Sequence, residues 1–309
     1  MTDRNMPPVS DAVVTLGTPR NIGQLPPVGP IAFGCWRLTG TDDATSATVN
    51  AAVELGMNLI DTADVYGLDW GGTAFGSCEE ALGRLLTAQP GLRDRIVLAT
   101  KGGIIPGQPY DSTSRYLVAA CEASLRRLAT DHVDLYQVHR PDMFTHPDEV
   151  FAAFTNLRSR GLVREVGVSN HTLHQTTLLE ARLSFNLASV QPQYSAAHLE
   201  PLRDGTLDHC MKKSLVPLAW SPLAGGRIAT GEGIRPGLLA VLDELAAREN
   251  VTRSAVAIAF VLAHPSKPVA IIGSQDPARL AEAAAATTVR LTRADLYRIV
   301  EASEGVPLP

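Results

Sequence analysis

The sequence has few cysteines, and their spacing excludes the usual cysteine-based sites. Cys35, Cys78, Cys121 and Cys210 are the four cysteines among 309 residues. They follow neither the paired spacing of a zinc site nor that of a C-x-x-C redox motif. We therefore predict four reduced thiols, as in a cytoplasmic protein, and no metal site.

Runs of like charge and long apolar segments are also missing. The formal net charge is −5, and no basic cluster indicates binding to nucleic acid or to an anionic membrane. The apolar runs fall short of the roughly 18 residues of a membrane-spanning helix, and the N-terminus lacks the pattern of a signal peptide. We expect a cytoplasmic location, small-molecule ligands, and neither nucleic acid nor membrane as a partner. The oligomeric state stays open.

Neither of the two glycine-rich phosphate-binding motifs occurs in the chain. A doubly wound dinucleotide-binding fold would place G-x-G-x-x-G after its first strand, and a P-loop would read G-x-x-x-x-G-K-[ST]. Both are absent from the sequence. This absence argues against those folds.

Short runs rich in Val, Ile and Leu alternate with longer amphipathic segments, as buried parallel strands alternate with helices. The eight runs are 31–34, 58–61, 96–100, 133–138, 163–168, 188–193, 216–220 and 269–272. The predicted helices are 44–55, 79–86, 116–128, 147–160, 172–183, 202–214, 236–249, 254–263, 277–286 and 293–302. The pattern predicts an α/β fold, a single-domain (β/α)8 TIM barrel over residues 1–309. Extra helices follow strand seven and end the chain, and residues 13–16 are predicted as one arm of a hairpin under the barrel.

Four polar residues lie where predicted strands end. Asp61 and Tyr66 follow the second run, Lys101 the third and His139 the fourth. Because the carboxyl ends of barrel strands share one mouth, we expect these side chains to meet. Asp61 and Lys101 are expected to pair, because an unpaired buried charge is costly.

Each of these residues alone has an ordinary structural explanation, but together they suit acid-base chemistry. A phenol has a pKa of about 10 and exchanges protons near neutrality only if a cation stabilises its anion. Lys101 supplies that cation, Asp61 holds Lys101, and His139 donates a hydrogen bond to a carbonyl oxygen. Such a site protonates an oxygen while a nucleophile such as hydride attacks the attached carbon.

The chain resembles the aldo-keto reductase superfamily, and its bacterial branch in particular. The motifs that carry the resemblance are D61-T-A-D-V-Y66-G, A-T-K101, D134-L-Y-Q-V-H139-R-P-D142, G167-V-S-N170, Q191-P-Q-Y194-S, W220-S-P-L-A-G-G-R227 and I272-G-S274-Q-D-P-A-R279-L. The resemblance implies reversible, nicotinamide-dependent reduction of aldehydes or ketones to alcohols. It makes Tyr66 the general acid-base, Lys101 the group that lowers its pKa, Asp61 the partner of Lys101, and His139 the carbonyl-orienting residue.

The resemblance also implies a cofactor site. Ser169, Asn170 and Gln191 would bind the nicotinamide carboxamide, and Tyr194 would stack on the ring. The segment with Trp220, Ser221, Leu223, Gly225 and Arg227 would cover the pyrophosphate, and Gly273, Ser274, Arg279 and Glu282 would lie near the adenosine phosphate. NADPH is expected, with NADH possible, because Gly273 stands where many members have Lys or Arg and Ala283 where many have Asn.

Loops after the strands are expected to form the substrate pocket. The candidates are Trp36, Leu68, Asp69, Trp70, Met143 and Phe144. His171 and His174 form H-x-x-H, but no third ligand is evident, so we expect exposed helix residues. Two alternatives to a reductase are a cofactor-binding accessory subunit with little turnover, as with potassium-channel β subunits, and a barrel isomerase or lyase without nicotinamide.

Overall fold

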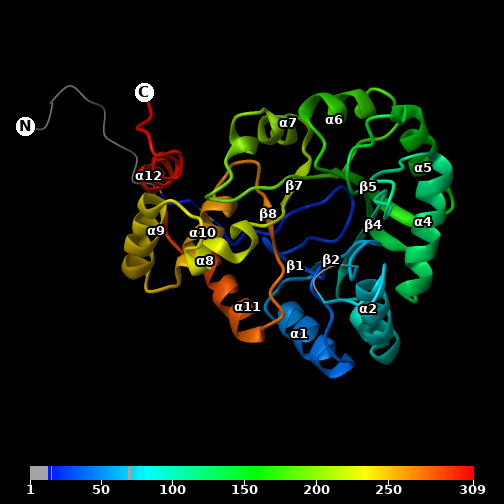
Figure 1. Cartoon of the computed structure of the whole chain (residues 1–309), viewed down its shortest axis with the longest axis horizontal. Coiled ribbons are helices and arrows are strands. Elements are labelled where there is room, and N and C mark those ends of the chain that lie inside the picture. The colour runs from blue at the N-terminus through cyan, green and yellow to red at the C-terminus, as the bar shows by residue number, and fades with distance from the viewer. Residues whose placement is uncertain (1–12, 15, 69–70) are drawn as a thin grey trace, which may run out of the picture.

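The computed structural model describes residues 13, 14, 16–68 and 71–309. Eight parallel strands close into a barrel in chain order, β1-β2-β3-β4-β5-β6-β7-β8, with β1 pairing β8 (Figure 1). The strands are β1 (Ile31–Gly34), β2 (Leu59–Asp61), β3 (Val97–Gly102), β4 (Val133–Val138), β5 (Val163–Ser169), β6 (Ser189–Gln191), β7 (Val216–Ala219) and β8 (Val269–Ile272). The predicted barrel is confirmed, with strand ends shifted by a residue or two.

Helices cover the outside of the barrel. They are α1 (Asp42–Glu54), α2 (Ser77–Ala88), α3 (Pro90–Arg93), α4 (Ser114–Arg127), α5 (Pro147–Ser159), α6 (Leu173–Glu180), α7 (Thr206–Lys213), α8 (Arg227–Thr230), α9 (Pro236–Glu249), α10 (Arg253–Leu262), α11 (Pro277–Ala284) and α12 (Arg293–Glu304). Their starts follow local chemistry: the Thr41 side chain accepts a hydrogen bond from the Ala44 N–H, and Pro147 occupies the first turn of α5. Extra helices after β7 and at the C-terminus are confirmed.

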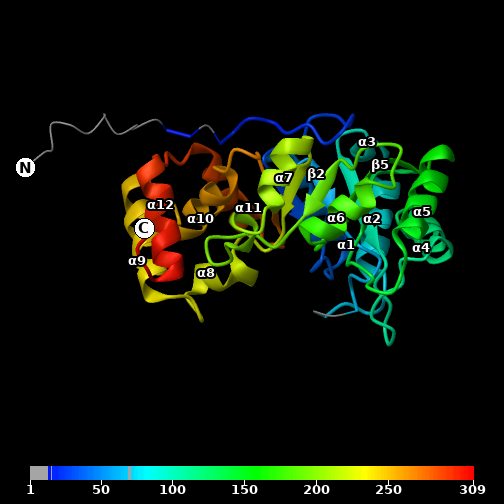
Figure 2. The same ribbon diagram turned by 90° about the horizontal axis from the view of Figure 1, so that it is seen from above.

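The predicted hairpin arm at residues 13–16 is wrong, because its described residues 13, 14 and 16 lie in no strand. The antiparallel bridge instead joins Arg20 to Val28. Arg20 is anchored by hydrogen bonds from its Nε to the carbonyl oxygens of Lys267 and Pro268, at 3.0 and 3.2 Å. This pins the N-terminal segment, blue in Figure 2, along one end of the barrel.

The interior of the barrel is filled from its amino end. Ile22, Leu25 and Val28 of the N-terminal segment pack with inward residues of the strands, such as Leu59 and Leu218. A larger apolar cluster lies between the strands and the helices. Because apolar side chains occupy one end, the polar residues on the strands gather at the carboxyl end.

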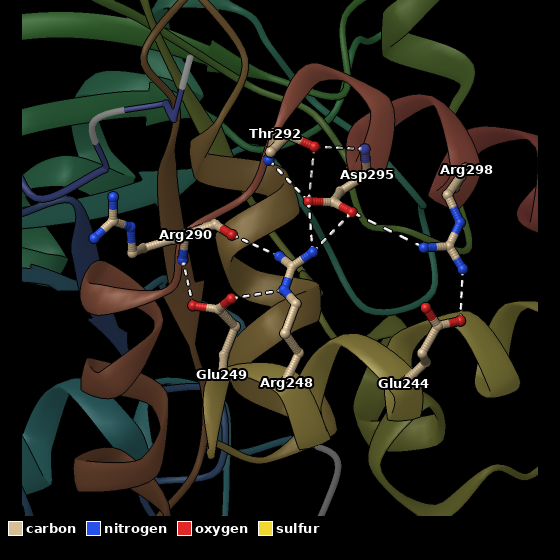
Figure 3. A network of polar contacts seen from close by, with 7 residues as sticks. All are labelled: Glu244, Arg248, Glu249, Arg290, Thr292, Asp295 and Arg298. Carbon is tan, nitrogen blue, oxygen red and sulfur yellow. Dashed lines mark hydrogen bonds and ion pairs between the residues drawn. The ribbon is translucent and has the colours of Figure 1, made fainter. Parts of the chain in front are cut away.

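A polar network fastens α12 to α9 (Figure 3). Arg248 Nη1 lies 3.0 Å from both carboxylate oxygens of Asp295, while Arg248 Nη2 donates to the Arg290 carbonyl oxygen at 2.7 Å. Asp295 also completes a capping box with Thr292 at the start of α12. Further along α12, Arg298 donates to Glu244 of α9 at 2.6 Å, so the helix that follows the barrel is held at more than one turn.

Within the described residues, no helix is both long and apolar enough to cross a membrane. The same part of the chain contains no group of three or more His, Cys, Asp or Glu side chains that could hold a metal ion.

Candidate active site

Lys101 brings two of the other predicted catalytic residues together at the carboxyl end of the barrel. Its ammonium nitrogen lies 2.6 Å from Asp61 Oδ2, 2.8 Å from the Thr62 carbonyl oxygen and 3.1 Å from the Tyr66 hydroxyl. Lys101 is fully buried and Asp61 almost so. All three ammonium protons therefore have acceptors, which is what a buried lysine requires to stay charged.

Two glutamines that face Asp61 complete this arrangement. The Gln191 and Gln137 amides donate to Asp61 Oδ1 at 3.0 and 3.3 Å, and the two amides meet at 3.4 Å. Gln137 is fully buried in β4, two residues before His139. The sequence interpretation missed this role of Gln137, although a lone amide in an apolar strand was a usable signal.

The protonation states follow from burial and from these contacts. Burial alone would lower the pKa of Lys101, but Asp61 and Tyr66 raise it above its ordinary value. Burial raises the pKa of Tyr66, and Lys101 pulls it back only in part. The predicted lowering by Lys101 is present, yet the net direction is upward. The structure therefore holds a protonated phenol beside a charged ammonium.

His139 lies beside Tyr66 in an edge-on arrangement. The two ring centroids are 5.6 Å apart, with the rings at 81°. Burial, aided by the charges of Lys101 and Arg140, holds the pKa of His139 well below its ordinary value, so the imidazole is neutral. Its Nδ1 is buried without a hydrogen-bond partner. Nε2 is not among the buried polar atoms that lack a partner in the described residues, so it is the ring nitrogen left to reach a ligand at the mouth.

Polar residues at the ends of β5, β6 and β7 are joined to His139 by hydrogen bonds. Asn170 Nδ2 donates to the His139 carbonyl oxygen at 3.2 Å, and Trp220 Nε1 donates to Asn170 Oδ1 at 2.9 Å. Ser169 Oγ donates to the Gln191 carbonyl oxygen at 3.1 Å. The structure therefore brings together Ser169, Asn170, Gln191 and Trp220 from the predicted cofactor set.

Tyr194 is placed differently from its neighbours in that set. It is only 1% exposed, and its ring packs against Phe260 of α10 with centroids 6.0 Å apart. Trp220, after β7, is partly exposed. In this structure Trp220 presents aromatic surface at the mouth, and Tyr194 presents almost none.

The segment after β7 has an unusual backbone. Ser221, Ala224, Gly225 and Gly226 all have positive φ, at 50°, 52°, 73° and 98°. The N–H groups of Ala224 and Gly226 donate within the segment, to the Ser221 and Leu223 carbonyl oxygens at 2.8 and 2.9 Å. A Cβ on Gly225 or Gly226 would meet nothing within 4 Å, so the backbone there is open to a ligand. Leu223 packs on the core, and Arg227 Nε donates to the Ala224 carbonyl oxygen at 3.0 Å.

The residues predicted near an adenosine phosphate follow β8. Ser274 Oγ accepts from the Asp276 N–H at 3.3 Å, and Asp276 caps α11. Arg279 lies in the first turn of α11 with a side chain 74% exposed, and its Nε is 3.7 Å from Asp276 Oδ2. Glu282 is exposed on the same helix. Gly273, the residue before Ser274, packs against the Trp36 side chain.

The predicted pocket residues differ in how far they are exposed to solvent. Trp36 is half-buried after β1. Met143 and Phe144 are 72% and 95% exposed, and Leu68 is exposed too, so none of these three forms a buried wall. Asp69 and Trp70 lie outside the described residues.

The H-x-x-H pair is split by the start of a helix. His174 is exposed on α6, as predicted. His171 precedes the Thr172 cap and is half-buried, with its Nδ1 3.0 Å from the Ser169 carbonyl oxygen. The prediction of an exposed helix residue is therefore wrong for His171, whose ring is held by β5.

Comparisons with known proteins agree with this geometry. The model of the Aldo/keto reductase family matches residues 30–304. The chain belongs to this family. It is 45% identical over 286 residues to a 6-dehydroglucose reductase of Novosphingobium aromaticivorans, covering 91% of this chain and 94% of the relative. It is 32% identical over 286 residues to the methylglyoxal reductase YeaE of Escherichia coli, covering 90% and 91%.

A solved structure confirms the fold. The thermostable aldo-keto reductase Tm1743, crystallised with the inhibitor epalrestat, superposes with a TM-score of 0.80 at 24% identity, covering 92% of this chain and 99% of that one. The family match and the two reductase relatives show that this aldo/keto reductase is an NAD(P)H-dependent enzyme that reduces carbonyl groups. No observation favours an accessory subunit without turnover.

Proposed function

We propose that this aldo/keto reductase reduces small aldehydes and ketones with NADPH, and that Tyr66 donates the proton. The observation that carries the proposal is the contact of Lys101 Nζ with both Asp61 and the Tyr66 hydroxyl, at 2.6 and 3.1 Å. Burial keeps the phenol protonated in the resting enzyme, and the Lys101 contact places a fixed cation beside the oxygen that loses the proton. We place the protein in the cytoplasm as one domain over residues 1–309, without nucleic-acid or membrane partners.

The residues at the mouth fit a nicotinamide nucleotide. The partly exposed Trp220 ring, held by Asn170, offers a face for stacking. Asn170 and Gln191 stay our proposed carboxamide ligands, and they would exchange their present hydrogen bonds to His139 and Asp61 for bonds to the cofactor. The small residues Ala224, Gly225 and Gly226 let a pyrophosphate approach the backbone, because no atom lies within 4 Å of a Cβ at either glycine. We assign the stacking role to Trp220 in place of Tyr194, because Tyr194 is buried against Phe260.

When bound, the nicotinamide supplies hydride to the carbonyl carbon. The Nε2–H of neutral His139 donates a hydrogen bond to the carbonyl oxygen and orients it, while the Tyr66 hydroxyl transfers its proton to the same oxygen. Lys101 stabilises the phenolate that remains, because its own charge is fixed by Asp61. In the direction of alcohol oxidation, the same groups take the proton back.

Small hydroxylated aldehydes are our proposed substrate class. The support is the name of the Novosphingobium relative, 6-dehydroglucose reductase, and its 45% identity to this chain. 6-Dehydroglucose is therefore the first hydroxylated aldehyde to assay.

The test follows the loss of NADPH absorbance with benzaldehyde and 6-dehydroglucose. Tyr66→Phe is expected to lower kcat by roughly 10²- to 10⁴-fold, the usual contribution of a general acid, while NADPH still binds. Tyr297→Phe is the matched control, since Tyr297 is an exposed tyrosine on α12. Undiminished turnover of Tyr66→Phe would refute the proton-donor role, and a higher kcat/KM with NADH would refute the NADPH preference.

A further inference from the structure

Arg140 lies at the mouth of the barrel, beside the Trp220 ring. It follows His139 directly at the end of β4, yet its guanidinium carbon lies 5.8 Å from the centre of the Trp220 ring after β7. The strands β5 and β6 separate β4 from β7 in the closed barrel. The Trp220 indole reaches Asn170 at the end of β5, and Asn170 in turn bonds the His139 carbonyl oxygen, so the ring and the Arg140 guanidinium meet near the ends of β4 and β5.

The charge of Arg140 is not neutralised by a neighbouring carboxylate. Within the described part of the chain, Arg140 forms neither an ion pair nor a hydrogen bond, and its contact is with the face of Trp220. Asp142 is two residues away, but its oxygens accept from the Ser112 N–H, the Phe144 N–H and the Thr145 hydroxyl, at 3.0, 3.0 and 2.6 Å. Lys101, the other cation near His139, is paired with Asp61.

A half-buried arginine without an acidic partner is suited to bind an incoming ligand. Its planar guanidinium presents several N–H donors in one plane, a geometry that matches paired oxygen atoms. Contact with the Trp220 face restricts the orientation of that plane. Arg140 is also close enough to His139, the group that we propose orients the reacting carbonyl, for its charge to help lower the pKa of that imidazole.

We propose that Arg140 is a specificity residue that binds paired oxygen atoms of the substrate away from the reacting carbonyl. The oxygens are those of a carboxylate or of vicinal hydroxyls, and both use the same guanidinium donors. The inference rests on the proposed reductase function and adds to it the substrate group that is recognised. It gives Arg140 no part in proton transfer.

The test compares two pairs of aldehydes that differ in oxygen content. Benzaldehyde is compared with 4-carboxybenzaldehyde, and propanal with glyceraldehyde, using the full-length wild type, Arg140→Ala and Arg140→Lys. Arg158→Ala is the matched control. Arg158 is also half-buried over an aromatic ring, 4.3 Å from the centre of Phe185, but it lies beside Val163 at the amino end of β5.

Arg140→Ala is expected to raise KM for the oxygen-bearing aldehydes by about 10- to 100-fold, the range for a hydrogen bond to a charged group, with kcat nearly unchanged. The values for benzaldehyde and propanal are expected to stay within about threefold, and Arg140→Lys to restore part of the binding. An effect confined to 4-carboxybenzaldehyde identifies a carboxylate as the ligand group, and one confined to glyceraldehyde identifies the hydroxyls.

Three results would overturn the inference. They are an unchanged preference in Arg140→Ala, an equal loss with all four aldehydes, and an equal effect in Arg158→Ala. Weaker NADPH binding by Arg140→Ala, measured by tryptophan fluorescence, that accounts for the whole change would assign the residue to positioning Trp220 instead. Failure of the proposed function is distinct, because the wild type would then reduce none of the four aldehydes.

Discussion

The Trp36 indole occupies the space in which a side chain at position 273 would begin. An ideal Cβ on Gly273 would lie 2.2 Å from Trp36 Nε1. The two residues follow β1 and β8, which are neighbours in the barrel. Trp36, expected in the substrate pocket, therefore contacts Gly273, expected near the adenosine phosphate. The indole leaves no room for a side chain at position 273.

We predict that Gly273→Ala destabilises the protein by about 1 to 3 kcal/mol, the usual cost of overpacking. Trp36→Ala in the same chain should remove most of that cost, because the indole is the obstacle. A double-mutant cycle of urea unfolding measures this coupling. Gly237→Ala is the control, since nothing lies within 4 Å of a Cβ there. Additive single effects would contradict the shared space.

The sequence predicted the barrel and the residues at its mouth because both depend on local patterns. The apolar runs mark the strands, and Asp61, Lys101 and His139 mark their ends. The contact of Trp36 with Gly273 was not predictable, since it depends on how the loops after β1 and β8 fold toward each other. The amide of Gln137 on Asp61 depends likewise on the register across three strands.

The protonation of Tyr66 shows a second limit to what the sequence can predict. The spacing of the sequence brings Lys101 to the phenol, and this predicts a lowered pKa. Burial acts in the opposite direction and is larger, and the sequence does not show how deeply a loop tyrosine lies. The charge partner was predictable, whereas the balance between charge and desolvation was not.

Variants of the Lys101–Asp61 ion pair should distinguish its contribution to stability from its contribution to catalysis. Lys101→Met leaves Asp61 as a buried carboxylate without its cation, which we expect to cost about 3 to 5 kcal/mol of unfolding free energy. Asp61→Asn combined with Lys101→Met removes both charges and should recover much of this loss. Neither variant should recover kcat, because the phenolate of Tyr66 would lack its cation. Urea unfolding and NADPH oxidation measure the two effects, and recovered turnover in the double variant would contradict the role of Lys101.

We predict that Arg279 and Asp276, at the start of α11, set the preference for NADPH over NADH. Arg279→Ala should weaken NADPH binding by about 10- to 100-fold and leave NADH binding unchanged, because only NADPH carries the additional phosphate. Asp276 lies 3.7 Å from Arg279 and repels a phosphate at the start of α11. Asp276→Ser, which retains a capping hydroxyl, should therefore favour NADPH further. Fluorescence titration with both cofactors measures these changes, and equal losses for NADH and NADPH would contradict a phosphate contact.

His171 makes the stability of the fold sensitive to acid. Burial lowers its pKa to about 4, against the hydrogen bond to the Ser169 carbonyl oxygen, which raises it. Between the ordinary value of 6.5 and about 4, the unfolded chain binds a proton that the folded chain does not. Stability is thus retained above that window and is lost as the pH falls through it.

The loss attributable to His171 reaches about 2 to 3 kcal/mol at the lower end of the window. His171→Gln should flatten the dependence of unfolding free energy on pH between 6.5 and 4. His174→Gln, an exposed change on α6, is the control and should leave the wild-type slope. His139 is also held neutral by burial, so part of the slope is expected to persist in His171→Gln. An unchanged slope in His171→Gln would show that His171 takes up its proton in the folded state as readily as in the unfolded chain.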